Sequence, residues 1–324
     1  MTSGLRERLV KSFLWGLSIL TAILSIGILF WWNYPLELLS SFRVYYLLLA
    51  VGITISCWLC QIWGWRVKLL LYFSLILVAF NSVWIVPWYL PQMQQGSEDS
   101  IRVLTFNINT QNDRWNEIAN AIVAIKPDVA VVIESSIESK EQLSQRLTGV
   151  LPFIYRTTGG GLTIFSRFPL VSPQSKTFNN DTVLITSLEI DSRTINLVAA
   201  HPIVPIKPNL FHRRNASLAE ITAYLQQQPK PLIFLGDLNL TLWSPYYSRL
   251  IGKTLLHNTR LGFGIEPSWI EAATYVHYPN WVTTLVKIPI DHIFVSQDFK
   301  VVDTQTAKAA NSDHRMLWSD LEIL

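Results

Sequence analysis

Three long runs without a charged residue occupy the first third of the chain. They span residues 13–32, 44–65 and 69–90 and contain 20, 22 and 22 residues. About 20 apolar residues in a helix are enough to cross the hydrocarbon core of a bilayer, because each residue adds about 1.5 Å. A cleavable signal peptide would account for one short run, but not for three. The sequence therefore predicts a membrane anchor over residues 1–90, with three transmembrane helices and the lipid bilayer as a partner.

Basic residues flank these runs unevenly. The N-terminus and the connection between the second and third runs carry five of them, whereas the first connection carries only Arg43 and residues 91–100 carry none; the five are Arg6, Arg8, Lys11, Arg66 and Lys68. Lys and Arg are retained on the cytoplasmic side of a membrane, so the pattern predicts a cytoplasmic N-terminus. Three crossings then place residues 91–324 outside the cytoplasm.

The remaining two-thirds of the chain has the composition of a folded domain. Residues 91–100 (PQMQQGSEDS) are polar and indicate a linker. From residue 101 to 324, short β-branched runs alternate with amphipathic segments, which is typical of an α/β or α+β domain. The expected strands are 101–108, 129–134, 162–166, 183–190, 195–201, 232–236 and 290–295, and helical spacing follows Asp113 and Arg214.

Polar side chains stand at the ends of several of these apolar runs. They are Asn107, Glu134, His201, the pair Asp237 and Asn239, Asp291, and the pair Asp313 and His314. Taken singly, each has an ordinary explanation, such as a turn, a strand-end cap or a solvated chain end. A rigid sheet can nevertheless bring such groups to one rim, so their order and spacing together predict a site.

In this order the motifs resemble the endonuclease/exonuclease/phosphatase superfamily, the family of deoxyribonuclease I. The most specific are Gly236-Asp237-Leu238-Asn239 and Ser312-Asp313-His314, supported by Pro127-Asp128 leading into Glu134 and by residues 159–170 (GGGLTIFSRFPL). The resemblance implies a four-layer α/β (α+β) sandwich, in which helices flank two packed mixed β-sheets, after the three transmembrane helices. It is greatest to a membrane-anchored bacterial branch, which implies a multi-pass protein of the bacterial cytoplasmic (inner) membrane.

The resemblance also implies a divalent metal site. Glu134 would be the main ligand, Asn107 would lie beside it, and Asp313 would complete the metal or water environment. Hard oxygen ligands of this kind suit Mg²⁺, with Mn²⁺ as an alternative, whereas zinc is disfavoured because no histidine pair or cysteine has the required spacing. One ion or two would satisfy the same residues.

Five further residues would form the catalytic group. Asp291 would orient His314, Asp237 would act on the attacking water, Asn239 would donate to the phosphoryl oxygens, and His201 would contact the phosphate or leaving oxygen. Either Asp237 or His314 could be the general base. Arg213 and Arg214, at the start of a helix, are weaker candidates for binding the substrate. His292 is expected on the opposite face of its strand, and Trp269 and Trp281 are expected to pack in the core.

These residues predict a membrane-anchored, divalent-metal-dependent phosphoric-ester hydrolase, a phosphodiesterase similar to the nucleases. The substrate is a phosphate ester of a nucleic acid, a lipid headgroup or a small molecule. Residues 91–324 hold 20 basic and 21 acidic residues, which disfavours a tight DNA binder. A lipid or small-molecule phosphatase or phosphodiesterase is the alternative, and a catalytically inactive tethered binding module is a third. No protein partner is predicted.

Overall fold

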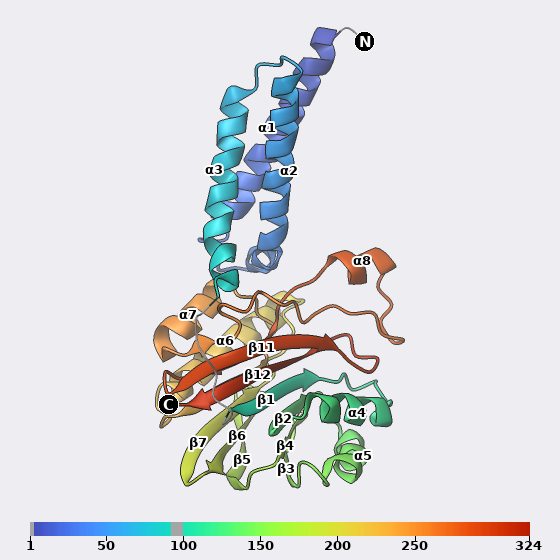
Figure 1. Cartoon of the computed structure of the whole chain (residues 1–324), viewed down its shortest axis with the longest axis vertical. Helices are drawn as coiled ribbons and strands as arrows, with labels where there is room; N and C mark the ends of the chain where they lie inside the picture. The colour runs from blue at the N-terminus through green and yellow to red at the C-terminus, as the bar shows by residue number, and fades with distance from the viewer. Residues whose placement is uncertain (1–2, 92–99) are drawn as a thin grey trace. The chain divides into compact units, whose positions relative to one another are not determined.

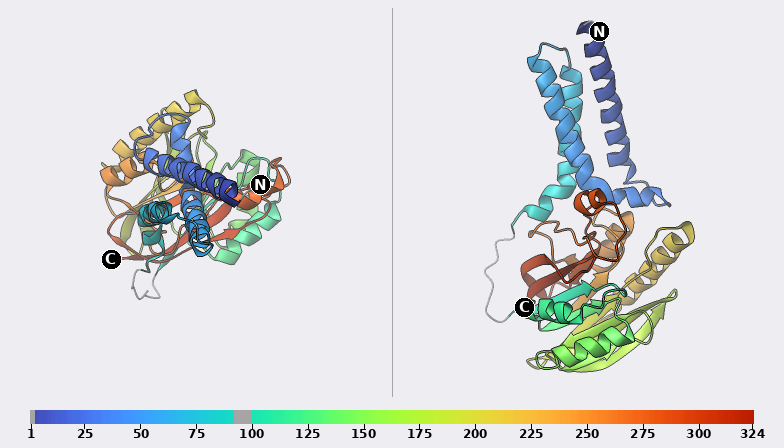
Figure 2. Two further views of the ribbon diagram at one scale, coloured as in Figure 1. Left: turned by 90° about the horizontal axis from the view of Figure 1, so that it is seen from above. Right: turned by 90° about the vertical axis from the view of Figure 1, so that its right-hand side faces the viewer.

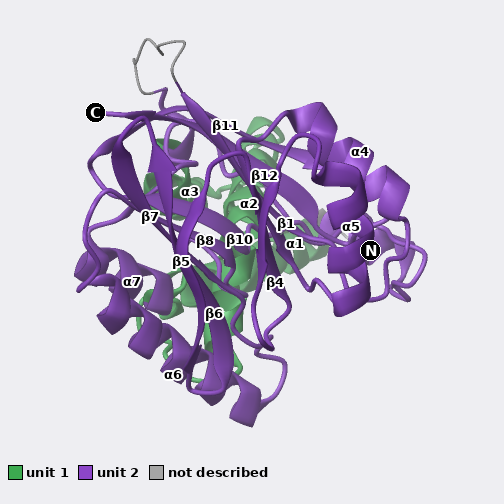
Figure 3. Ribbon diagram, turned by 90° about the horizontal axis from the view of Figure 1, so that it is seen from below, with its two compact units in different colours: residues 1–87, 243–245 green, residues 88–242, 246–324 purple. Residues whose placement is uncertain are grey.

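The computed structural model describes residues 3–91 and 100–324, so the predicted linker 91–100 lies almost entirely outside the described residues. The chain divides into two compact units (Figure 3). The first comprises residues 1–87 with 243–245, and the second comprises residues 88–242 with 246–324. Each unit is described here by itself.

The first unit is built from three long helices, α1 (Ser3–Gly27), α2 (Arg43–Ile62) and α3 (Lys68–Ile85), with short 3₁₀ turns at Leu36–Phe42 and Val86–Tyr89 (Figures 1 and 2). Three spans are long and apolar enough to cross a membrane: Gly4–Gly27, Leu36–Ile62 and Lys68–Tyr89. The first begins at Gly4 rather than at the predicted residue 13. Its charged first turns remain helical, where Lys11 pairs with Glu7 at the favourable i,i+4 spacing.

The second unit contains two six-stranded sheets. The first sheet has the order β11-β12-β1-β2-β4-β3, and the second has the order β5-β6-β7-β8-β10-β9. The strands of the first sheet are β1 (Ile101–Asn107), β2 (Val129–Ile133), β3 (Phe153–Arg156), β4 (Leu162–Ser166), β11 (Phe299–Lys308) and β12 (Arg315–Ile323). Those of the second are β5 (Leu170–Phe178), β6 (Asp181–Ile190), β7 (Arg193–Ala200), β8 (Leu232–Asp237), β9 (His257–Asn258) and β10 (Asp291–Val295). Both sheets are mixed, because β1 and β2 are parallel, as are β7 and β8.

Helices cover the two outer faces, so the predicted four-layer sandwich is confirmed (Figure 3). The helices are α4 (Trp115–Ile125), α5 (Ile137–Leu147), α6 (Pro208–Leu225) and α7 (Pro245–Thr254), and the short α8 (Asn280–Leu285) lies in the connection between β9 and β10. One apolar cluster fills the space between the sheets, including Val131, Leu197 and Leu235. A second cluster joins the outer face of the first sheet to α4 and α5. Burial of these apolar faces is the main stabilising contribution.

Strand pairing places the polar strand ends together. Asn107 is opposite Ile133 in the parallel pair β1–β2, so Glu134 follows directly beside it. Asp237 is directly opposite Asp291 in the antiparallel pair β8–β10. Gly236 has φ of +143°, and a Cβ there would lie 2.0 Å from the carbonyl oxygen of Ala200. Only glycine permits this close approach of β7 to β8, which brings the residues that follow each strand next to one another.

Candidate active site

The amide of Asn107 connects the two sheets at the centre of the site. Its Nδ2 donates to Oε1 of Glu134 at 3.0 Å and to Oδ2 of Asp237 at 3.2 Å. Its Oδ1 accepts a hydrogen bond from the backbone N–H of Asn109 at 3.0 Å. Asn107 is fully buried, and the other oxygen of Glu134 accepts from the backbone N–H of Thr110. Two carboxylates from different sheets thus share one amide donor.

Asp291 and His314 form a buried pair. Nδ1 of His314 lies 2.9 Å from Oδ2 of Asp291, and its Nε2 lies 3.6 Å from Oδ2 of Asp237. Burial lowers the pKa of His314, but the carboxylates of Asp291 and Asp237 outweigh it and raise that pKa to about 10. Burial raises the pKa of Asp291, and the imidazole of His314 outweighs it, so that pKa lies below its ordinary value. The pair therefore favours an imidazolium beside a carboxylate.

Asp237 lies between two imidazoles. Nε2 of His201 and Nε2 of His314 each lie 3.6 Å from Oδ2 of Asp237, and Nε2 of His201 lies 3.9 Å from Oε1 of Glu134. Burial and the nearby charge of Asp291 raise the pKa of Asp237 to about 6, while His314 and His201 oppose the shift. The acidic neighbours of His201 are therefore Asp237 and Glu134, at the centre of the site.

Three residues of the site have backbone φ angles in the left-handed region. The φ angles of Asn109, Glu134 and Asn239 are 63°, 58° and 49°. This conformation is uncommon for residues other than glycine, and such residues concentrate at functional sites. The turn at Asn239 is held by its backbone N–H, which donates to Oδ1 of Asp237 at 2.9 Å, and by its Nδ2, which donates to the carbonyl of Pro202 at 3.0 Å.

Asp313 is held by three side-chain donors: Asn109, Trp269 and Tyr275. Its carboxylate accepts hydrogen bonds from Nδ2 of Asn109 at 3.2 Å, from the indole N–H of Trp269 at 3.3 Å and from the hydroxyl of Tyr275 at 3.4 Å. Asn109 is therefore the link between Asp313 and Asn107. Neither Asn109 nor Tyr275 is predicted from the sequence, because no motif marks them.

The donor set around Asn107 fits a divalent cation of the Mg²⁺ type. Two carboxylates and an amide converge there from Glu134, Asp237 and Asn107, which are hard oxygen ligands once the amide turns its oxygen inward. A second group, Asp237, Asp291 and His314, offers one ligand atom each within 4.8 Å of one another. It is a weaker fit, because Nδ1 of His314 is engaged by Asp291 and a protonated imidazole does not bind metal.

A layer of buried polar groups lies behind Asp291. The guanidinium of Arg260 donates to the backbone carbonyl of Asp291. The hydroxyl of Ser268 accepts from the backbone N–H of Asp291 at 3.0 Å. His292 points to the opposite face of β10, as predicted: one ring nitrogen lies 3.0 Å from Nδ2 of Asn258 and the other 2.7 Å from the carbonyl oxygen of Leu240. No sequence signal marks Arg260, which is fully buried.

Arg213 and Arg214 lie inside α6, which begins at Pro208, rather than at the start of a helix. Arg214 is buried and donates to the backbone carbonyl of Asn239 at 2.7 Å. Arg213 donates to the carboxylate of Asp181, a carboxylate that also accepts from the backbone N–H of Ile203 in the loop after His201. These contacts favour positioning roles for both arginines over direct contact with substrate.

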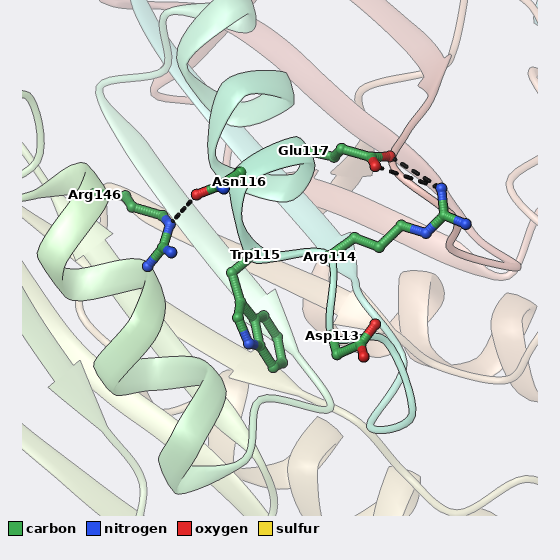
Figure 4. A pocket seen from close by; sticks show the side chains of 6 residues that line it. All are labelled: Asp113, Arg114, Trp115, Asn116, Glu117 and Arg146. Atoms are coloured by element: carbon green, nitrogen blue, oxygen red, sulfur yellow. Dashed lines mark hydrogen bonds and ion pairs between the residues drawn. The ribbon is translucent and has the colours of Figure 1, made fainter.

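A separate hollow of about 180 Å³ lies where the loop after Asn109 enters α4 (Figure 4). It contains none of the predicted site residues. Its two arginines are engaged: Arg114 pairs with Glu117 at 3.4 Å, and Arg146 donates to the amide oxygen of Asn116 at 2.6 Å. The polar strand ends therefore remain the candidate active site.

Comparison with known proteins agrees with this fold. A family model described as "Endonuclease/Exonuclease/phosphatase family" matches residues 104–314. No curated protein sequence matches the chain. An endonuclease/exonuclease/phosphatase from Beutenbergia cavernae DSM 12333 has a similar structure, with a TM-score of 0.56, 19% identity and coverage of 69% of this chain and 72% of its own.

Two further solved structures resemble the chain. For sphingomyelinase C from Streptomyces griseocarneus the TM-score is 0.53 at 16% identity, over 68% of this chain and 99% of the other. For a mannosyl-6-phosphatase from Bacteroides thetaiotaomicron VPI-5482 the TM-score is 0.54 at 15% identity, over 69% and 100%. Identities this low establish a shared fold, and the family match extends from β1 to His314. The chain belongs to the endonuclease/exonuclease/phosphatase family.

Proposed function

We propose that this chain is a membrane-anchored, divalent-metal-dependent phosphoric-ester hydrolase. The observation that supports it best is the continuous series of contacts from Glu134 through Asn107, Asp237 and His314 to Asp291. In-line hydrolysis of a phosphate ester needs a positioned water, neutralised phosphoryl oxygens and a stabilised leaving group. Residues of this series, with His201 and Asn239, offer an acid–base carboxylate, two imidazoles and amide donors for those tasks.

Glu134 and Asn107 would hold the metal ion, with Mg²⁺ or Mn²⁺ as the expected ion. The bound ion would supply positive charge to the phosphoryl oxygens. Asp313 supports this site through Asn109, which favours an orienting role for its carboxylate.

Asp237 is the group best placed to take the proton of the attacking water. Both ring nitrogens of His314 face carboxylates, those of Asp291 and Asp237, so this imidazole is placed as a donor and a positive charge. Asp237 faces His201 as well, at 3.6 Å, which allows a second imidazole to reach the phosphate or the leaving oxygen. The side-chain amide of Asn239 has two N–H hydrogens, and one of them donates to the carbonyl of Pro202. The other would donate to a phosphoryl oxygen.

The anchor and the domain together suggest an enzyme of the bacterial cytoplasmic membrane with its catalytic domain outside the cytoplasm. Proteins of the same fold include a sphingomyelinase and a mannosyl-6-phosphatase. The class of phosphate ester that this chain hydrolyses is therefore a question for experiment. A nuclease-like phosphodiesterase is the reference proposal, with a lipid or small-molecule ester as the alternative.

The test is hydrolysis by the full chain, purified in detergent. An aryl phosphodiester, an aryl phosphomonoester, single-stranded and double-stranded DNA and a phospholipid in mixed micelles are each assayed with Mg²⁺, with Mn²⁺ and with excess chelator. We expect turnover of at least one ester that depends on added metal. Absence of turnover of every ester under every metal condition would instead indicate the inactive, tethered binding module.

A further inference from the structure

The segment around α8 exposes large apolar side chains to solvent. Tyr278, Trp281 and Leu285 have exposed fractions of 51%, 63% and 60%. The expectation that Trp281 packs in the core is therefore wrong. The chain between β9 and β10 makes a long excursion that carries α8 away from the sheets (Figure 1).

Two of the exposed side chains form an apolar face on α8. Trp281 and Leu285 are four residues apart on α8, so they lie one above the other on the same side of the helix. Thr283, on the opposite side, is buried. Tyr278 precedes the helix, and its ring packs edge-on against Trp269, with ring centroids 6.3 Å apart. Tryptophan and tyrosine are the residues that concentrate at the headgroup level of membranes.

A group of basic residues includes Lys287, which follows the end of α8 by two positions. Glu271 is buried and is contacted by three cations: Lys287 at 3.0 Å, Lys308 at 3.0 Å and Arg315 at 3.4 Å. These three cations and Glu271 together carry a net charge of +2. The net charge is +1 when the carboxylate of Asp313 is added to the group. The side chain of Lys308 is 71% exposed. Anionic lipid headgroups attract a basic surface of this kind.

A bilayer crossed by the three candidate spans would also lie close to the domain. The third membrane-spanning candidate ends at Tyr89 and β1 begins at Ile101, so 11 residues connect them. A chain of that length spans at most about 40 Å. Tethering at this range gives even a weak interfacial contact a high effective concentration.

We propose that the α8 segment, Tyr278–Leu285, inserts its apolar face into the headgroup region of the bilayer that anchors the chain, with anionic lipids preferred. The segment is joined to the candidate active site through Trp269, whose ring packs on Tyr278 and whose indole N–H donates to Asp313. The contact holds the site at the lipid surface and, resting on the proposed hydrolase function, favours a lipid-borne phosphate ester as substrate.

The experiment uses the full chain with Cys57→Ser and Cys60→Ser, reconstituted in nanodiscs that hold one copy each. An environment-sensitive fluorophore is attached through Trp281→Cys or, as a second position on the same face, Leu285→Cys. Val150→Cys is the matched control, because Val150 is 50% exposed and follows α5 instead. The discs contain either phosphatidylcholine alone or phosphatidylcholine with phosphatidylglycerol.

We expect blue-shifted emission at both α8 positions, quenching by a lipid-borne quencher and protection from iodide, with an aqueous spectrum at Val150→Cys. The shift should be larger with phosphatidylglycerol, and Lys308→Gln should reduce that difference. Spectra at both α8 positions that match the control would overturn the proposal. The same labelled chains are also reconstituted in vesicles that hold several copies each. A spectral shift that appears in these vesicles but not in the single-copy nanodiscs would assign the face to a second copy of the chain. Because fluorescence does not depend on turnover, the result is independent of whether the hydrolase proposal holds.

Discussion

Nδ1 of His314 lies 2.9 Å from Oδ2 of Asp291, although 23 residues separate the two in the chain. The carboxylate is fully buried and the imidazole is almost so. An unpaired charge in such a buried position is costly. Each of the two groups therefore allows the other to carry its charge.

The first prediction concerns this pair. His314→Ala should lower kcat/KM by about 10²–10⁴, the usual effect of losing an acid–base group. Asp291→Asn should give a loss of similar size, and the double variant should be little worse than either, because groups that act as one unit are strongly non-additive. The measurement is a double-mutant cycle on kcat/KM with one ester at saturating metal. Single losses that multiply in the double variant would show that the residues act independently.

Glu134 should be essential for metal dependence. Glu134→Gln keeps the shape of the side chain and removes its charge, so activity should fall by several orders of magnitude and the metal concentration needed for half-activity should rise. Glu138→Gln, in the first turn of α5, is the matched control and should behave as the parent enzyme. Full activity of Glu134→Gln in excess chelator would remove this residue from the metal site.

His292 should make the domain sensitive to acid. Burial and the nearby charge of Arg260 lower its pKa to about 3, from an ordinary value of 6.5. Between these values the unfolded chain binds a proton that the folded domain does not, so His292 favours folding above pH 6.5. This contribution is lost as the pH falls towards 3, by about 1.4 kcal/mol per pH unit.

The check is Tm against pH for the full chain in detergent, compared with His292→Gln. The variant cannot titrate in this range, so its Tm should depend less steeply on pH between 6.5 and 3, even if it is lower throughout. Parallel curves for the two proteins would contradict this role of His292.

The orientation of the chain in the membrane is also testable. From the distribution of Lys and Arg around the three spans we expect residues 97–324 to be removed by protease added to intact spheroplasts. Protection in spheroplasts, with cleavage only in inverted vesicles, would reverse the predicted topology. A cytoplasmic reporter protein in the same cells shows that the membrane has stayed closed.

The sequence predicted the strands that are buried on both faces, because their apolar runs are continuous. β4 was placed at its observed limits, and β1, β2, β8 and β10 within one residue at either end. The unrecognised strands are polar or interrupted. β5 is an edge strand that is mostly exposed. β12 carries Ser319 and Asp320 among its apolar residues, and they are accommodated by partners far away in the chain: Asp320 pairs with Arg102.

The candidate site was predictable as a set of residues but not as a geometry. Asn107, Glu134 and Asp237 were identified at the ends of apolar strands because their order and spacing together predict a site, although each alone has an ordinary structural explanation. The placement of Asp313 depends on the left-handed turn at Asn109 and on Trp269 and Tyr275, which come from two other segments. Side-chain direction in such turns is set by tertiary contacts, which leave no periodic pattern in the sequence.

The opposition of Asp237 and Asp291 across β8 and β10 implies a compromise between activity and stability. Two like charges on facing positions of a buried antiparallel pair repel each other, and burial together with the charge of Asp291 raises the pKa of Asp237, so the fold disfavours its charged form. Asp237→Asn keeps an acceptor for the backbone N–H of Asn239 and removes the repulsion. That variant should therefore melt at a higher temperature than the parent while losing turnover, which would make it the natural form in which to capture a bound ester.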